Sequence, residues 1–201
     1  MQETDILNYI KVFENIVPNE LCNKLMSYNF KYGPAHMADH HKDDYQSYTN
    51  SVSMEEAFII SEHELYTEIN LCFNKLASLY KYPHLYLERK TNCKILKYSA
   101  GGFINEHTDT LGYEFFKRKV PSLWKGINPD LQYGMPNVTL TLYIKDDYEG
   151  GELRIAKKNF GIIKKGSGVC FPSNFIFPHA VTKVTKGTRY AIVCWYLEDK
   201  L

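Results

Sequence analysis

The chain has 201 residues, 44% hydrophobic and 23% charged, so it is long enough for one globular domain with a substantial core. Its 24 Lys and Arg residues nearly balance its 23 Asp and Glu residues, and the net charge of +1 argues against a strongly basic surface for duplex nucleic acid. No apolar stretch approaches the roughly 20 residues that a membrane span needs.

The first eighty residues predict one short strand and two helices. Alternation over residues 9–13 favours the strand, and a proline near the first turn favours a helix over 18–26. Residues 61–80 carry apolar side chains at helical intervals, with Ser61 as the expected N-cap and Glu64 completing a capping box. The expected apolar face consists of Leu65, Ile69, Cys72, Phe73, Leu76 and Leu79.

Residues 31–55 are polar and lack a regular period, which predicts an irregular loop. The loop gathers three histidines and three aspartates, and such a cluster could bind a metal. A hydrated loop is the favoured interpretation, because nothing in the pattern would hold these side chains rigidly. The cluster consists of His36, Asp39, His40, His41, Asp43 and Asp44.

Short strands separated by turn residues dominate the chain from residue 93 onward. Their near-regular spacing is typical of a sandwich or jelly roll. The expected strands cover residues 93–98, 103–107, 137–145, 152–155, 168–171, 182–186 and 189–197. The chain is therefore expected to be α+β and mainly β, with a single domain over 1–201 that has a helical support region over 1–90 and a β core over 91–199.

The strand expected at 137–145 alternates strictly between two kinds of side chain. Successive residues of a strand point to opposite faces, so one face would be apolar and the other polar or aromatic. The apolar set is Val138, Leu140, Leu142 and Ile144, and the second set is Thr139, Thr141 and Tyr143. Such a strand suits a barrel whose outer face packs on helices while its inner face lines a ligand cavity.

Residues 110–136 form a long segment rich in glycine, proline and aromatic residues. Loops of this length are usually functional or disordered, and the aromatic content favours a lid or a substrate-binding loop. A simple surface insertion remains the alternative.

One spaced motif carries the chemistry of the chain. His107 and Asp109 stand two residues apart, and His179 follows about seventy residues later. Residues i and i+2 of a strand share a face, so His107 and Asp109 could reach one metal together, with His179 brought alongside by the fold. Two imidazoles and one carboxylate are the facial triad of non-haem Fe(II) sites. Arg189 lies ten residues after His179 and could bind a carboxylate deeper in the same cavity.

Each of these residues alone has a simpler interpretation. A lone His-x-Asp is a weak motif, a lone histidine is usually a loop or core residue, and a lone arginine is usually solvated. The order, the spacing and the strand context together favour the metal site over these alternatives.

The chain resembles the Fe(II)- and 2-oxoglutarate-dependent dioxygenases over about residues 90–199, most closely the prolyl 4-hydroxylase branch. Several motifs coincide with those of the family in the right order. These are Tyr98 before a Gly-Gly turn, the His107-Thr108-Asp109 tripeptide, a Leu-Tyr-Ile strand leading into Glu-Gly-Gly-Glu-Leu, Lys165-Gly166, Pro178-His179-Ala180-Val181, and Arg189 followed by Trp195.

The resemblance assigns roles to these positions. His107, Asp109 and His179 would be the iron ligands, and Arg189 would bind the distal carboxylate of 2-oxoglutarate, where many prolyl-type enzymes have lysine. The remaining residues expected to bind the cosubstrate or wall its pocket are Tyr98, Thr139, Tyr143 and Trp195. Tyr143 and Trp195 could instead be plain core aromatics.

The resemblance also implies the activity. The enzyme would use Fe(II), O2 and 2-oxoglutarate and release succinate and CO2. Ascorbate could serve as its reductant. The favoured substrate is a prolyl residue of a peptide or protein, with a free amino acid or other small molecule as the alternative. A non-catalytic jelly-roll module that binds metal is a second alternative. Nucleic-acid demethylases of the superfamily usually carry a second arginine six residues after the first, where this chain has Trp195.

The cysteines and the N-terminus bear on the cellular compartment. The five cysteines are widely spaced and contain no Cys-x-x-Cys pair, which favours reduced buried thiols over disulfides or a zinc site. Residues 1–5 lack the basic region and apolar run of a signal peptide. A cytoplasmic protein is therefore expected.

Overall fold

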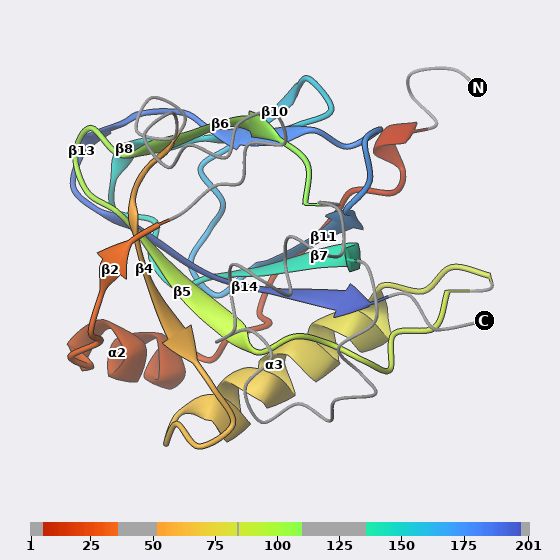
Figure 1. The fold of residues 1–201 in the computed structure, drawn as a ribbon, viewed down its shortest axis with the longest axis horizontal. Helices are drawn as coiled ribbons and strands as arrows, with labels where there is room; N and C mark the ends of the chain where they lie inside the picture. The colour runs from red at the N-terminus through yellow and green to blue at the C-terminus, as the bar shows by residue number, and fades with distance from the viewer. Residues whose placement is uncertain (1–5, 36–51, 84, 110–135, 198–201) are drawn as a thin grey trace, which may run out of the picture.

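The computed structural model describes residues 6–35, 52–83, 85–109 and 136–197. Two antiparallel sheets face each other, and two helices, α2 (Asn19–Ser27) and α3 (Tyr66–Leu79), cover the outer face of the larger sheet (Figure 1). The loop expected at 31–55 is described only in part, and its cluster of histidines and aspartates lies outside the described residues. The aromatic segment 110–135 also lies outside the described residues.

The larger sheet has seven strands in the order β1-β11-β7-β14-β5-β4-β2. Its long central strands, β7 and β14, are the segments with the clearest strand pattern in the sequence. The strands are β1 (Lys11–Phe13), β11 (Gly168–Pro172), β7 (Pro136–Tyr143), β14 (Arg189–Leu197), β5 (Cys93–Tyr98), β4 (Glu55–Ile59) and β2 (Gly33–Pro34).

The smaller sheet has five strands in the order β10-β9-β12-β6-β3, and a separate two-stranded ribbon joins β13 to β8. The strands of the smaller sheet are β10 (Lys158–Gly161), β9 (Leu153–Ile155), β12 (His179–Val181), β6 (Phe103–His107) and β3 (Val52–Ser53). The ribbon consists of β13 (Val184–Lys186) and β8 (Glu149–Gly150). The facing sheets confirm the predicted mainly β jelly roll with N-terminal helices.

The alternation predicted for β7 is confirmed by the two sides of the larger sheet. Its apolar side chains join the core beneath the helices, together with Leu25 of α2 and Phe73 of α3. The opposite face turns toward the smaller sheet, where Val193 and Trp195 of β14 pack with Val181 of β12. The side chains on the other face of these strands therefore line the interior between the two sheets.

The predicted start of the second helix is wrong. The helix begins five residues later than Ser61, and no side chain caps its first turn. The hydroxyl of Ser61 donates to the neighbouring carboxylate instead, while Nδ1 of His63 accepts the N–H of Leu65 at 3.1 Å. The His63 ring packs against Tyr28 with ring centroids 4.8 Å apart. This tertiary contact keeps the segment before Tyr66 from joining the helix.

The predicted apolar face of this helix is confirmed except at its end. Leu65, Ile69, Phe73 and Leu76 are buried, whereas Leu79 is 46% exposed because it lies in the last turn, beyond the sheet. Short strands at β2, β3, β4 and β10 were not predicted, and three of them precede residue 90. The division into a support region and a β core stays a prediction.

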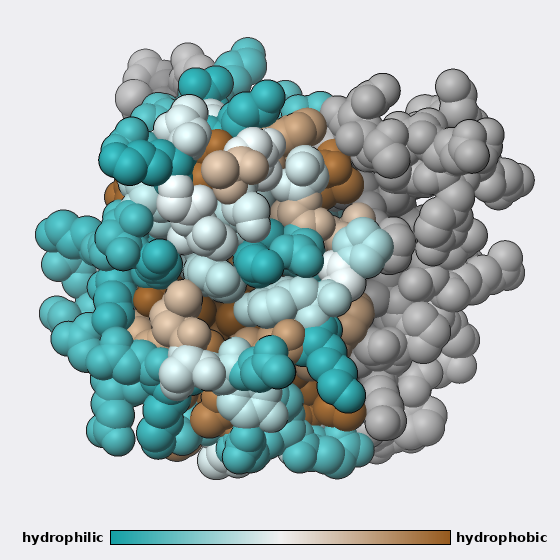
Figure 2. Space-filling view, turned by 90° about the vertical axis from the view of Figure 1, so that its left-hand side faces the viewer, coloured by the Kyte–Doolittle hydropathy of each residue, from teal (hydrophilic) through white to brown (hydrophobic). Residues whose placement is uncertain are grey.

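The surface and the thiols agree with the composition. The face shown in Figure 2 is mostly hydrophilic, and hydrophobic residues occupy only small areas between hydrophilic ones. All five cysteines are free and buried, as expected. In the described part of the chain, none of the helices is both long and apolar enough to cross a membrane.

Candidate metal centre

Two neighbouring strands of the smaller sheet bring the histidines together. His107 ends β6, His179 begins β12, and the two residues are direct partners in the antiparallel pairing. Their rings tilt against each other with centroids 4.2 Å apart. The prediction that the fold places His179 beside His107 from a second strand is confirmed.

Backbone carbonyls set the orientation of both imidazoles. Nδ1 of His107 lies 2.9 Å from the carbonyl of Asn105, and Nδ1 of His179 lies 3.3 Å from the carbonyl of Phe177. A carbonyl oxygen only accepts, so each Nδ1 must carry the hydrogen. Each Nε2 is then left as a lone-pair donor, which is the state in which a histidine binds a metal.

Asp109 faces both of these nitrogens. Its Oδ1 lies 3.6 Å from Nε2 of His107, and its Oδ2 lies 3.4 Å from Nε2 of His179. The expectation that His107 and Asp109 share one strand face is wrong in detail, because β6 ends at His107 and Asp109 lies in a bend. The carboxylate reaches the site because the chain turns inward there.

A buried hydroxyl of β7 holds the Asp109 carboxylate, and a second buried hydroxyl, just after β11, supports the first. The hydroxyl of Thr139 donates to Oδ2 of Asp109 at 2.7 Å, and the Thr139 and Ser173 hydroxyl oxygens are 2.9 Å apart. Since the single Thr139 hydrogen goes to Asp109, Ser173 must donate to Thr139. Thr139, expected in the cosubstrate pocket, therefore lies beside the candidate metal ligands, and its contact with a cosubstrate stays a prediction.

The charge states of the three groups suit a metal at neutral pH. Burial alone would raise the pKa of Asp109, but the adjacent His179 and His107 lower it below its usual range. Burial lowers the pKa of His179 to about 4, although Asp109 opposes the shift. An ionised carboxylate beside a neutral imidazole is the protonation state that metal coordination requires.

The donor geometry fits a single ion. The three ligand atoms lie within 4.8 Å of one another, and no other group of three or more such residues occurs in the described ranges. Ligand atoms about 2 Å from a common ion at right angles are about 3 Å apart, close to the 3.4 and 3.6 Å found here. Two nitrogens and one oxygen on one side of the ion match the facial triad of Fe(II) sites.

The start of β14 places a buried cation in the same interior. Arg189 is only 2% exposed, and no described residue offers a hydrogen-bond partner to its Nε and Nη1 atoms. Burial of a guanidinium with two unpaired nitrogens carries a desolvation penalty, so an anion at this position would stabilise it. A carboxylate, which only accepts, is a suitable partner for such N–H groups.

Two of the predicted pocket tyrosines enclose this guanidinium. The Arg189 Cζ atom lies 4.7 Å from the ring centre of Tyr98 and 5.1 Å from that of Tyr143. Thr139 at the metal and Tyr143 at the arginine are four residues apart on one face of β7, or ~13 Å along the strand. The interior between the sheets therefore has a candidate metal group at one end and a buried cation at the other.

Trp195 lies at the metal end, where it pairs with Thr139 across the sheet. It is 4% exposed, and Nζ of Lys94 lies 5.3 Å from its ring centre. Lys94 itself is bound to Glu56 at 2.9 Å, and both side chains are largely buried. The sequence analysis missed this ion pair, since an alternating Lys on a strand is usually solvated.

Sequence reasoning also missed Ser173 and Tyr148. Ser173 sits in a turn, and nothing in its neighbourhood distinguishes it from other turn serines. Tyr148, buried beside Arg189, stands two residues before a pair of glycines in the sequence. The available signal was those glycines, because they allow close approach of the backbone.

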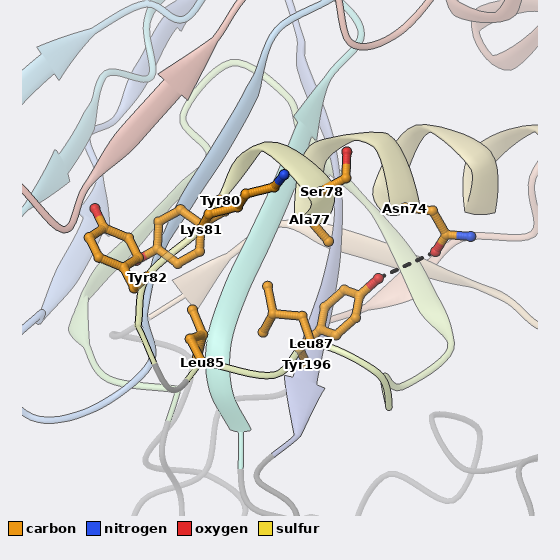
Figure 3. Close-up of a pocket in the computed structure, with 9 residues that line it drawn as sticks. All are labelled: Asn74, Ala77, Ser78, Tyr80, Lys81, Tyr82, Leu85, Leu87 and Tyr196. Atoms are coloured by element: carbon orange, nitrogen blue, oxygen red, sulfur yellow. Dashed lines mark hydrogen bonds between the residues drawn. The ribbon is translucent and has the colours of Figure 1, made fainter.

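A separate pocket of about 470 Å³ lies at the end of α3 (Figure 3). Tyr80, Leu87 and Tyr196 help to line it, and the Tyr196 hydroxyl donates to Asn74 at 3.3 Å. Tyr196 belongs to the core on the helix side of the larger sheet, whereas its neighbour Trp195 faces the interior. The pocket is therefore on the opposite face of the sheet from the histidines.

Comparison with known sequences gives matches over the same part of the chain. Residues 93–197 match the family described as the 2OG-Fe(II) oxygenase superfamily. A PKHD-type hydroxylase of Alteromonas mediterranea is 41% identical over 71 residues, which are 33% of this chain and 30% of that protein. Prolyl 3-hydroxylase 2 of Homo sapiens is 33% identical over 75 residues, 34% of this chain and 11% of that protein. The matches thus cover less than a third of either relative.

Solved structures show the same fold at low identity. A Pseudomonas putida prolyl-4-hydroxylase superposes with a TM-score of 0.65 at 15% identity, covering 99% of this chain and 100% of that chain. A viral collagen prolyl hydroxylase of Paramecium Bursaria Chlorella virus-1, solved with 2OG, gives 0.63 at 17%, covering 93% and 94%. A Trichoplax adhaerens prolyl hydroxylase, solved with a hypoxia inducible factor peptide fragment, gives 0.64 at 17%, covering 96% and 86%.

Proposed function

The chain belongs to the 2OG-Fe(II) oxygenase superfamily, and from this premise we propose that it hydroxylates a prolyl residue of a peptide, using 2-oxoglutarate and O2. The observation that carries the proposal is the joint geometry of the interior. A His-Asp-His group that could hold iron stands at one end, and a buried guanidinium with two unpaired nitrogens stands at the other.

The chain's own side chains would bind the two reactants. His107, Asp109 and His179 would hold Fe(II) on one side and leave its other positions open. Arg189 would bind the distal carboxylate of 2-oxoglutarate, and the Tyr98 and Tyr143 rings would keep water away from that ion pair. Burial of the cation strengthens its attraction for the carboxylate, because the surroundings screen the charges less than water does.

With iron bound, the chemistry supplied is the coupled oxidation in which O2 places one oxygen on the substrate carbon and one in succinate, as 2-oxoglutarate loses CO2. The protein fixes the reactants and their protonation. Thr139 donates to Asp109 and so holds the carboxylate ionised and in place. The Nδ1 hydrogen bonds keep both histidine rings turned toward the ion. The buried walls exclude water from the reacting centre.

The substrate class rests on the relatives. The curated relatives are a PKHD-type hydroxylase and a prolyl 3-hydroxylase, and the similar structures are prolyl hydroxylases, one of them bound to a peptide fragment. These names support a peptidyl proline. A free amino acid is the second candidate that the experiment must separate.

The test is a turnover assay on a panel of proline-containing peptides and free amino acids. With Fe(II), 2-oxoglutarate and O2, we expect succinate formation and a mass gain of about one oxygen on a peptide. The His107→Ala variant should lose both signals. The exposed neighbour Glu106 provides the matched control, and Glu106→Gln should keep them.

Other outcomes would reassign the protein. Hydroxylation of free proline or another amino acid, with every peptide inert, would favour the small-molecule alternative. Metal binding without succinate formation under any condition would favour a non-catalytic module.

A cytoplasmic location belongs to the same proposal. Five free buried thiols support it, because a reducing compartment keeps cysteines in this state. Cell fractionation with an antibody against the chain would test it, and recovery from a secreted fraction would refute it.

A further inference from the structure

Lys94 and Glu56 form an ion pair on the face of the larger sheet that turns toward the smaller one. Nζ of Lys94 lies 2.9 Å from the Glu56 carboxylate, and the two side chains are only 13% and 7% exposed. Lys94 is the cross-strand partner of Val193, which packs in the interior between the sheets. Buried ion pairs add little net stability, because the desolvation of both charges offsets most of their attraction. The position of this pair is therefore better explained by binding than by stability.

The pair lies one side chain away from the candidate metal ligands. Nζ of Lys94 is 5.3 Å from the ring centre of Trp195, and Trp195 is the cross-strand partner of Thr139. Thr139 donates to Asp109. Trp195 acts on the same carboxylate, since burial raises the pKa of Asp109 whereas the two histidines and Trp195 lower it. A substrate bound at the metal would therefore lie within reach of the Lys94 ammonium.

The Lys94 ammonium has hydrogen-bonding capacity to spare. An ammonium carries three N–H donors, and Glu56 is its only hydrogen-bond acceptor in the described part of the chain. Glu56 also neutralises the charge of the ammonium. A second carboxylate would therefore gain little attraction here and would lose its own hydration. A neutral acceptor, such as a peptide carbonyl, loses less on entering the same position.

A prolyl residue within a peptide supplies such an acceptor. Proline has no backbone N–H, so the backbone of the residue offers only its carbonyl oxygen for hydrogen bonding. We propose that Lys94 donates to the carbonyl oxygen of the substrate prolyl residue, and that Glu56, by neutralising Lys94, favours a peptide-bonded proline over one with a free carboxylate. The proposal rests on the proposed function, because it assigns the specificity of the same site.

The experiment measures peptide binding without turnover. The most active peptide of the turnover panel is shortened so that it ends in its target proline, once as an amide and once as a free acid. Protein loaded with 2-oxoglutarate and with Mn(II) in place of Fe(II) is titrated by calorimetry with the uncut peptide and with both shortened forms. The wild type should bind the amide form more tightly than the acid form.

Two variants separate the roles of the pair. Lys94→Met removes the donor and should weaken binding of the amide form about 10-fold, the effect of one hydrogen bond to a charged group. Glu56→Gln leaves the ammonium without its counter-charge and should reverse the preference, so that the acid form binds more tightly. Both variants should bind Mn(II) and 2-oxoglutarate within twofold of the wild type, because no contact among the described residues joins the pair to the metal ligands or to Arg189.

Lys97→Met is the matched control. Lys97 belongs to the same strand and pairs with Glu55 of β4 at 2.7 Å, but it lies on the opposite face, and its partner is 45% exposed. This variant should bind both peptide forms as the wild type does. Loss of one partner of a buried pair can prevent folding, so the double variant Lys94→Met/Glu56→Gln is measured too. It leaves no charge of the pair in the interior and should bind the amide form as weakly as Lys94→Met.

The outcomes separate this proposal from the proposed function. If the wild type binds both shortened forms equally, or if the double variant binds the amide form like the wild type, the proposal is overturned and the proposed function stands. An unchanged preference in Glu56→Gln, or an equal loss in Lys97→Met, would overturn it as well. If only the uncut peptide binds, recognition lies beyond the proline, and the proposal is again overturned. If no peptide of the panel binds to the loaded wild type, the proposed function itself fails.

Discussion

Each polar atom near Asp109 has a definable task. One oxygen of this carboxylate accepts from Thr139, and that threonine in turn accepts from Ser173. Thr139 is 1% exposed and Ser173 is fully buried, so water cannot replace either partner. This chain of hydroxyls fixes the carboxylate before a metal arrives, and partners of this kind commonly tune metal affinity 10–100-fold.

Replacing the threonine tests this role. Thr139→Val keeps the shape of the side chain but removes the donor, and the affinity for Mn(II) or Co(II) is expected to fall about 10-fold or more. Competition against a coloured chelator measures it. Thr141→Val, two residues along the same strand, is the control and should bind metal normally. Equal affinities for the two variants would mean that the hydroxyl does not position the metal ligand.

Among the elements, the short β8–β13 ribbon has the tightest backbone packing near the site. Gly150 pairs with Val184 in the ribbon, and a Cβ at this position would collide with the backbone carbonyl of Lys183. The same ribbon leads from Tyr148 on one side to Arg189 on the other. Its close approach therefore helps to position Arg189 and Tyr148.

Gly150 and Gly161 form a natural pair for a stability test. Both have a φ of 69°, but nothing lies within 4 Å of a Cβ built on Gly161. Gly161→Ala should cost only the strain of a left-handed residue, about 1–2 kcal/mol. Gly150→Ala should cost at least ~3 kcal/mol, because backbone atoms must also move. Urea unfolding would measure both, and equal losses would show that the ribbon yields easily.

At the scale of the molecule, the candidate site takes its residues from both sheets. His107 and His179 come from the smaller sheet, whereas Thr139 and Arg189 come from the larger one. A metal with 2-oxoglutarate would thus bind groups from both layers. Ligands that bind only the folded protein stabilise it by an amount that grows with the logarithm of the ligand concentration above Kd.

Thermal unfolding should register this linkage. At a ligand concentration about 100 times Kd, binding contributes ~2.7 kcal/mol, which for a chain of this size raises Tm by about 5–10 °C. Mn(II) with 2-oxoglutarate should therefore raise Tm, and a chelator should reverse the rise. Asp109→Ala should show no rise under the same conditions. A similar rise in that variant would place the metal elsewhere on the protein.

The local sequence pattern was sufficient to predict many of the side chains that line the interior. Strict alternation from Val138 to Ile144 predicted which side chains face the helices, because a strand has a period of two wherever one face is buried. The order, spacing and strand context of His107, Asp109, His179 and Arg189 predicted the metal group and the buried cation. Their assigned roles in binding still await experiment.

Other features depended on contacts between distant residues. The helix begins late because His63 packs on Tyr28, and Asp109 reaches the histidines from a bend rather than from their strand. Neither follows from nearby residues, since tertiary packing overrides weak local preferences.

The sequence by itself determined the fold class, the strand faces and the set of candidate ligands, because periodicity and residue chemistry are local properties. Only the tertiary structure decided that Ser173 supports Thr139 and that Tyr148 lies against Arg189. Those pairs are far apart in the chain, and their contact depends on strand register and on the close backbone approach that Gly151 and Gly187 permit.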